Sequence, residues 1–147
     1  MVNQILLERI MTDIRAYVRD LRDEQDISWD SFRSDKKIRR YIERTLHVAI
    51  EAVLDAAQHI ISDQGFREPA SYRDTFLVLA ENGVISHELL SCLENMASFR
   101  NLLVHYYERV DNEILFGILK KNLGDFDQFV KELSDYLTTH GTPRSPL

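Results

Sequence analysis

The first 64 residues of this 147-residue chain contain neither glycine nor proline, and the first of each are Gly65 and Pro69. Glycine and proline are the strongest local breakers of regular structure, so a long stretch without them favours long helices. Apolar residues recur along this stretch three and four positions apart, which is the spacing of one helical face. The pattern predicts one amphipathic helix running to about residue 25 and a second from residue 35 to about residue 62.

The apolar period breaks between these two helices, where Trp29 and Phe32 stand three positions apart. We interpret this segment as a short turn that buries two aromatic rings. Ser34 comes just before the second helix, and a serine there suits the N-cap because its hydroxyl can accept a hydrogen bond from the first helical turn.

The second half of the chain contains clear helix boundaries. Ser71 followed by Asp74 has the form of a capping box and predicts a short helix. Asn82-Gly83 supplies the left-handed stop that helices favour at their C-terminal ends. Ser86 is the next N-cap, for a helix from about residue 87 towards residue 104.

Helical spacing resumes at Asp111 and predicts one long final helix, with a possible bend because Gly117 and Gly124 interrupt it. The last eight residues, 140–147, hold one glycine and two prolines and predict a flexible tail. No segment alternates polar and apolar residues as a strand does. The predicted fold is therefore all-α, an antiparallel bundle of about five helices that forms a single domain over residues 1–139.

Composition limits the classes of function. The net charge of -6 argues against a protein that coats nucleic acid, because such binding needs many Lys and Arg side chains, so any RNA contact must be local. No apolar run approaches the roughly 20 residues that span a bilayer, and Glu8 and Arg9 interrupt the N-terminal segment where a secretory signal would be apolar. The single cysteine, Cys92, forms no intramolecular disulfide. We expect a cytoplasmic protein with no membrane contact.

Arg100 lies on the apolar face of the fourth predicted helix, where Leu93, Met96 and Leu103 recur at helical spacing. Charged side chains rarely occupy such a position without a partner. In a structural interpretation, Arg100 bonds a buried carboxylate or helix carbonyls and joins two elements. In a functional interpretation, its guanidinium binds an anion. The spacing alone leaves both open.

His105 follows Arg100 by five residues, which places the two side chains about 140° apart around a regular helix. One straight helix therefore cannot direct both at the same atom. They converge only if the helix ends near His105, or if a second copy of the chain brings its own pair across a two-fold axis.

The segment Arg100-Asn101-Leu102-Leu103-Val104-His105-Tyr106-Tyr107 resembles the R-x4-H motif of the HEPN superfamily, and the final tyrosine resembles the extended R-x4-H-x-Y form of HepT toxins. The resemblance covers most of the chain. The further segments that resemble HepT toxins, in the same order, are Arg40-Tyr41-Ile42-Glu43-Arg44, Ala49-Ile50-Glu51, Pro69 with Tyr72, Phe76 with Leu79, Gly83-Val84-Ile85 and Met96-Ala97-Ser98-Phe99.

This resemblance implies the toxin of a type VII-like toxin–antitoxin system, a homodimeric and metal-independent endoribonuclease that cleaves tRNA or mRNA by 2′-OH transesterification. His105 suits proton transfer near neutral pH, and the forked, permanently charged Arg100 suits phosphate oxygens. Asn101 could orient the histidine or donate a hydrogen bond to phosphate. The family also implies silencing by a cognate nucleotidyltransferase antitoxin that transfers AMP to Tyr107, which would share the face of Arg100 if the helix continued that far.

Lys36, Lys37, Arg40 and Arg44 form a basic stripe opposite the apolar face of the second helix. The stripe could contact RNA or an acidic partner, or it could be a solvated helix face. No cofactor is expected. No metal is expected either, because metal-ligand spacing is absent from the remaining histidines: His47, His59, His87 and His140.

A second function from another class also fits the sequence. The chain could be a catalytically silent helical dimer that acts as a partner-binding or regulatory module, with Arg100 and His105 kept for structure. Replacing His105 distinguishes the two functions, because a toxin would lose RNA cleavage while its fold and its dimer survive.

Overall fold

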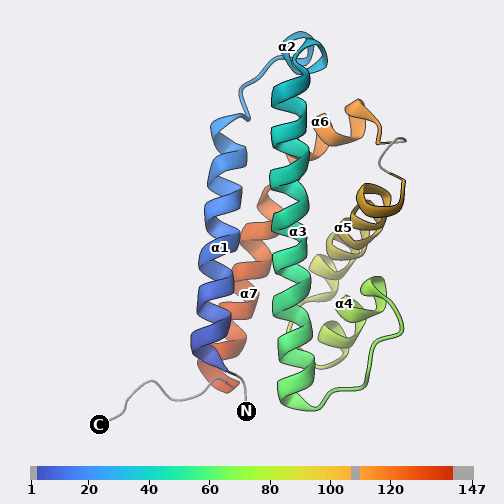
Figure 1. The fold of residues 1–147 in the computed structure, drawn as a ribbon. Helices are drawn as coiled ribbons and strands as arrows, with labels where there is room; N and C mark the ends of the chain where they lie inside the picture. The colour runs from blue at the N-terminus through green and yellow to red at the C-terminus, as the bar shows by residue number, and fades with distance from the viewer. Residues whose placement is uncertain (1–2, 107–109, 141–147) are drawn as a thin grey trace.

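The computed structural model describes residues 3–106 and 110–140, and all regular structure within these ranges is helical. The helices are α1 (Gln4–Asp23), α2 (Trp29–Ser34), α3 (Lys36–Gln64), α4 (Tyr72–Glu81), α5 (His87–His105), α6 (Asn112–Lys121) and α7 (Gly124–His140). Figure 1 shows α1 and α3 side by side along the long axis, with α7 behind them and α4 and α5 on the opposite side of α3. The prediction of an all-α bundle is confirmed.

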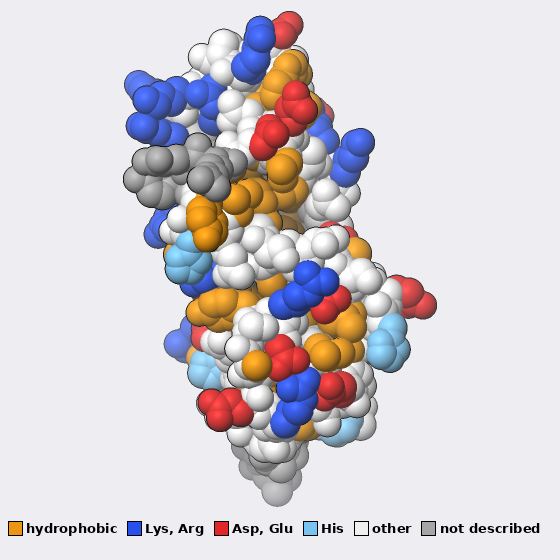
Figure 2. All heavy atoms as spheres, turned by 90° about the vertical axis from the view of Figure 1, so that its right-hand side faces the viewer, with side chains coloured by type: hydrophobic (Ala, Val, Ile, Leu, Met, Phe, Trp, Pro, Cys, Tyr) orange, Lys and Arg blue, Asp and Glu red, His pale blue; other side chains and the backbone are white. Residues whose placement is uncertain are grey.

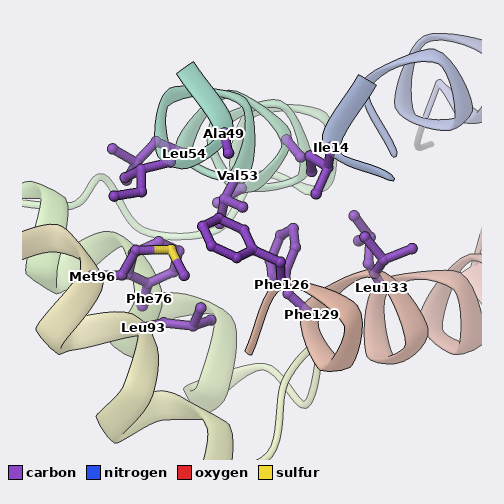
Figure 3. Packing of buried hydrophobic residues seen from close by; sticks show 14 of the residues in the cluster. Ile14, Ala49, Val53, Leu54, Phe76, Leu93, Met96, Phe126, Phe129 and Leu133 are labelled. Atoms are coloured by element: carbon purple, nitrogen blue, oxygen red, sulfur yellow. The ribbon is translucent and has the colours of Figure 1, made fainter. Parts of the chain in front are cut away.

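The core lies where these long helices face one another. Figure 3 shows Ile14 of α1, Val53 of α3 and the α7 side chains Phe126, Phe129 and Leu133 meeting between the ribbons. All five are at most 1% exposed. Burying an apolar side chain of this size stabilises a fold by about 1.5–3 kcal/mol, so this contact fixes the position of α7 against α1 and α3.

The segment before α3 differs from the prediction. Trp29–Ser34 is a short helix rather than a turn, with Ser28 as its N-cap. Ser34 is the last residue of that helix, and its hydroxyl donates to the carbonyl of Asp30. The N-cap of α3 is Asp35, whose carboxylate accepts hydrogen bonds from the amides of residues 37 and 38. The predicted N-cap was therefore one residue too early, because aspartate caps a helix as well as serine does.

The two aromatic rings of this segment pack as expected, against a neighbour from far along the chain. Phe32 is fully buried and Trp29 is partly buried. Phe116 of α6 meets both rings, with centroid separations of 5.2 Å in each case. Such edge-on and tilted aromatic contacts fasten α6 onto α2 at one end of the bundle.

The predicted single final helix is wrong, because α6 and α7 are separate. α6 ends with Asn122 as its C-cap, and α7 begins at Gly124. Leu123 between them is 2% exposed, so its side chain enters the core at the break. Glycine lowers helix stability by about 1 kcal/mol relative to alanine, and here the buried Leu123 decides where the helix stops. The break lets α7 turn back along α1.

The start of α5 is held by two sets of contacts. Ser86 is its N-cap, as predicted, and accepts a hydrogen bond from the amide of Leu89. Glu132 of α7 accepts hydrogen bonds from both the amide and the hydroxyl of Ser86, at 2.6 and 3.1 Å. The preceding stop is also as predicted, since Gly83 has a φ of 72°, a conformation that suits glycine.

α7 includes His140, the first residue of the predicted tail, and residues 141–147 lie outside the described residues. The predicted domain limits therefore remain a prediction. None of the helices in the described ranges has the length and apolar character needed to cross a membrane.

An ion-pair network fastens the loop after α3 to α4. Arg67 donates two hydrogen bonds to Asp74, at 2.8 and 2.9 Å, and two to Glu81, both at 3.0 Å. The amide of Ala70 also donates to Asp74, at 2.8 Å. The hydrogen bonds from Arg67, and then that from Ala70, lower the pKa of Asp74 to about 2, and those from Arg67 lower the pKa of Glu81.

This network predicts a pH-dependent contribution to stability. A carboxylate with a lowered folded pKa stabilises the fold above its unfolded pKa of 3.8 and loses that contribution as the pH falls through about 2. We expect Asp74→Asn to destabilise the protein at neutral pH, with the deficit shrinking between about pH 4 and about pH 2. Urea unfolding of both proteins across this pH range measures the difference in free energy of unfolding.

Asp30→Asn is the matched control, because Asp30 makes one longer contact, 3.7 Å, to Arg33. Its deficit should be much smaller at every pH. An Asp74→Asn deficit that stays constant from neutral pH to pH 2 would contradict the role given to the network.

Candidate active site at the C-terminal end of α5

Arg100 sits on α5 where three helices meet. Its Nε donates to Oε1 of Glu51 on α3 at 2.7 Å, and its guanidinium lies 4.3 Å from the ring centroid of Tyr72 on α4. The side chain is 14% exposed. A charge-assisted hydrogen bond and a stacked ring fix the planar group in one orientation. The prediction that Arg100 occupies the apolar face of this helix is confirmed.

The partner of Arg100 differs from the one that the structural interpretation expected. That interpretation called for a buried carboxylate, whereas the side chain of Glu51 is 41% exposed. The ion pair therefore lies at the border of the core with solvent. Glu51 holds the guanidinium by Nε. The terminal nitrogens, of which Nη1 has only one long contact, keep N–H groups that can meet an anion.

Asn101 contacts Arg100 rather than His105. Its side-chain oxygen accepts a hydrogen bond from Nη1 of Arg100 at 3.4 Å, a long contact at the exposed surface. Among the two roles expected from the sequence, this contact fits a place beside the anion-binding group. No hydrogen bond joins Asn101 to His105 within the described part of one chain, and the orienting role stays a prediction.

His105 is the last residue of α5, and Tyr106 is the C-cap. The imidazole is exposed and makes an edge-on contact with the ring of Tyr106, at a centroid separation of 6.5 Å. The expectation that the helix ends near His105 is confirmed. In the described part of the chain, however, no hydrogen bond joins His105 to Arg100, so one chain does not bring the pair together through a direct contact.

The sequence also predicted roles for Tyr107 and for the basic stripe at the start of α3. Tyr107 lies outside the described residues, and α5 ends at His105, so the condition that would have placed Tyr107 on the face of Arg100 is not met. The basic stripe is exposed throughout, at Lys36, Lys37, Arg40 and Arg44.

Sequence reasoning missed three side chains of this site, two that contact Arg100 and one that contacts its carboxylate partner. Glu51 and Tyr72 hold its guanidinium, and His47 places Nε2 3.2 Å from the same Glu51 oxygen that Arg100 contacts. Glu51 and Tyr72 do fall within segments that resemble HepT toxins, which is the one signal that pointed to them. Their approach to Arg100 depends on how α3, α4 and α5 pack, so no local pattern could predict it.

The site holds two kinds of group, a fixed cation and an exposed imidazole. A guanidinium fork matches the oxygens of a phosphate, and an imidazole can transfer protons near neutral pH. Among the described residues, no cluster of three or more His, Cys, Asp or Glu side chains is placed to hold a metal ion. The described groups therefore suit proton transfer beside a bound anion.

Apolar surface surrounds this end of α5. Val104 and Tyr106, on either side of His105, are 37% and 55% exposed, and Ile114 of α6 is 48% exposed. A cavity of about 260 Å³ opens between α3, α5, α6 and α7, and Ile114 and Phe99 both line it. Figure 2 shows apolar side chains gathered across the middle of this face of the molecule. Large exposed apolar side chains in one region mark surfaces that contact a partner.

The sequence matches the family model described as Ribonuclease HepT-like over residues 8–133. It is 32% identical over 129 residues to the mRNA nuclease HepT of Shewanella oneidensis, covering 88% of this chain and 96% of that protein. It is 24% identical over 138 residues to the tRNA nuclease HepT of Aphanizomenon flos-aquae, covering 94% of each.

A solved structure with the same fold is that of the tri-AMPylated Shewanella oneidensis HEPN toxin in complex with MNT antitoxin. It superposes with a TM-score of 0.82 at 27% identity, over 91% of this chain and 99% of the toxin. The match of the family model to most of the chain, together with the identity to the Shewanella protein, shows that this chain belongs to the HepT-like ribonuclease family.

Proposed function

We propose that this chain is the endoribonuclease toxin of a type VII-like toxin–antitoxin pair, and that Arg100 and His105 carry out the cleavage of RNA. The observation that supports this most is the fixed orientation of Arg100, which Glu51 and Tyr72 hold at the surface on the helix that ends in an exposed His105. Family membership supplies the reaction class, since the relatives are named as nucleases of mRNA and of tRNA.

The proposed reaction uses the nucleophile that RNA itself carries. The 2′-hydroxyl attacks the adjacent phosphorus, an O2′–P bond forms, and the P–O5′ bond breaks. A neutral His105 imidazole accepts the proton of the hydroxyl, and a protonated imidazole donates one to the leaving 5′-oxygen. Arg100 stabilises the extra negative charge of the phosphorane, with Asn101 beside it. The products are a 2′,3′-cyclic phosphate and a 5′-hydroxyl, and no step requires a metal ion.

The function predicts that His105→Ala removes cleavage without removing the fold. General acid–base catalysis contributes about 10²–10⁴-fold, so we expect cleavage of tRNA or an mRNA transcript in EDTA to fall at least about 100-fold. Growth inhibition on expression should disappear. The exposed position of His105 predicts an unchanged circular dichroism spectrum and melting temperature.

His87→Ala is the matched control, because His87 is exposed at the opposite end of the same helix. This variant should cleave RNA as the wild type does. Wild-type protein that cleaves none of these RNAs, or a His105→Ala variant that unfolds, would favour the silent partner-binding module instead.

We propose further that the functional unit is a homodimer. Arg100 and His105 lie five residues apart on one regular helix, so their directions differ by about 140°. A two-fold axis near the end of α5 would bring the histidine of one chain to the arginine of the other and would cover the apolar surface around Val104 and Tyr106.

A shared site predicts complementation between two inactive variants. When Arg100→Ala and His105→Ala chains pair, one of the two clefts receives an intact arginine from one chain and an intact histidine from the other. We expect the purified mixed dimer to regain activity within a few-fold of wild type, while each variant alone stays inactive. If the mixed dimer forms and remains inactive, each chain uses its own pair and the shared cleft is wrong.

We propose that a partner nucleotidyltransferase silences the toxin by transferring AMP from ATP to the hydroxyl of Tyr107, with loss of the hydroxyl proton and release of pyrophosphate. The solved complex of the tri-AMPylated Shewanella toxin with its MNT antitoxin supports this kind of partner. Tyr107 stands two residues after His105 in the sequence. A bulky, anionic AMP group on this tyrosine would compete with the RNA phosphate for Arg100.

Tyr107→Phe should therefore remain active when it is co-produced with the neighbouring nucleotidyltransferase. The wild type should be silenced and should carry a mass increase of one or more AMP groups in intact-mass spectrometry. Tyr106→Phe is the matched control and should still be modified and silenced. AMP found on Tyr107→Phe but absent from Tyr106→Phe would transfer the modification site to Tyr106.

A further inference from the structure

The N-terminal half of α3 carries a row of cations that leads to the site. Viewed along the axis of α3, four cations lie within about 60° of the direction in which Glu51 leaves the helix: Lys36, Lys37, Arg40 and Arg44. The helical rise places Arg44 about 10 Å and Arg40 about 16 Å from Glu51 along the axis. Because Glu51 holds Arg100, the row and the proposed phosphate site share one face of the molecule.

These cations are not neutralised by the rest of the described chain. Arg22 and Arg73 each pair with a carboxylate, and Arg67 pairs with two, whereas no member of the row forms an ion pair with another described residue. Figure 2 shows Lys and Arg side chains gathered at its upper left edge, on the end of the molecule that carries α2 and the start of α3. In a chain with a net charge of -6, this is a local positive region.

The charge changes sign on the other side of Arg100. A depression between α1, α3 and α4 contains Glu51 and Tyr72, and its other charged members are Asp13 and Asp55. Asp55 follows Glu51 by one helical turn, and its side chain is 57% exposed. An RNA strand that leaves Arg100 in this direction meets carboxylates. A strand that leaves along the start of α3 meets cations.

An exposed aromatic ring lies beside the row. Tyr41 directly follows Arg40, and its side chain is among the large apolar groups that remain accessible, at 44%. A row of cations interleaved with an aromatic side chain is how proteins bind single strands, because phosphates meet the cations while a base stacks on the ring. Along the axis, Lys37, Arg40 and Arg44 follow one another at steps of about 4.5 and 6 Å, so the cations are spread over a length of helix and not gathered at one point.

We infer that the N-terminal half of α3 binds the sugar–phosphate backbone of single-stranded RNA on one side of the bond that is cut. The inference rests on the proposed function and adds the path of the substrate. Lys and Arg contacts to phosphate do not distinguish bases, so the contribution of this surface is independent of sequence. The RNA runs from Arg100 past His47 and Arg44 towards α2, and not towards the acidic depression.

The test uses binding in the inactive His105→Ala protein, so that cleavage does not consume the probe. We measure the affinity of a fluorescent oligouridylate of roughly a dozen nucleotides, a length typical of single-strand sites, over a range of salt concentrations. Adding the double substitution Arg40→Gln/Arg44→Gln to the His105→Ala protein should weaken binding of the oligonucleotide about tenfold. It should also reduce the slope of log affinity against log salt by about 1.4, the value for two lost phosphate contacts on a single strand.

Arg15→Gln/Arg19→Gln is the matched control, because these two exposed arginines are also four residues apart, on α1. This pair removes the same charge and should change the affinity less than about twofold. Equal losses from both pairs would mean that only net charge matters, and the path along α3 would be wrong.

Two further outcomes overturn the inference, and one measurement separates it from the proposed function. The path is wrong if Arg40→Gln/Arg44→Gln binds RNA normally but loses its nucleotidyltransferase partner, because the row is then a protein interface. It is also wrong if no variant binds the oligonucleotide. If His105→Ala still cleaves RNA, the catalytic proposal fails, and the two arginine pairs are then compared on a 2′-O-methylated oligouridylate, which lacks the nucleophile, so that the comparison still decides the path.

Discussion

Helix α3 packs against α1, α2, α4 and α5, and these contacts shape the rest of the molecule. Its buried residues pack against α1 on one side and against α4 and α5 on the other. Its buried residues begin at Ile42, and a polar strip stays outside the packed faces along the 29-residue helix. That strip carries Glu51, His47 and the basic row, so the element that organises the core also organises the site.

The position of Arg100 shows how the bundle prepares a functional group. Three helices reach it, since α5 supplies the side chain, α3 the carboxylate and α4 the ring. Sites built on packed helices hold their geometry more closely than sites on loops, because each helix is already fixed by its own buried face. His105 stands in contrast at the last residue of α5, where exposure leaves the imidazole accessible.

Local charge matters more here than net charge. The acidic balance of the chain disfavours extended contact with nucleic acid, and the carboxylates near Arg100 reinforce this on the side of Asp13 and Asp55. The cations without described partners at the start of α3 produce the opposite sign within the same helix. An enzyme that must hold a short stretch of RNA, and release it, can combine these two regions without becoming basic overall.

The sequence by itself determined the all-α class, the N-caps at Ser71 and Ser86, the stop at Gly83, and the place of Arg100 on a buried face. These features depend on spacing and on the chemistry of single residues, which are local. Tertiary structure decided the break at Leu123 and the contacts of Arg100 with Glu51 and Tyr72. Each of these features depends on contacts between segments that are distant in the sequence. The spacing of residues along the chain predicts local structure and does not predict such contacts.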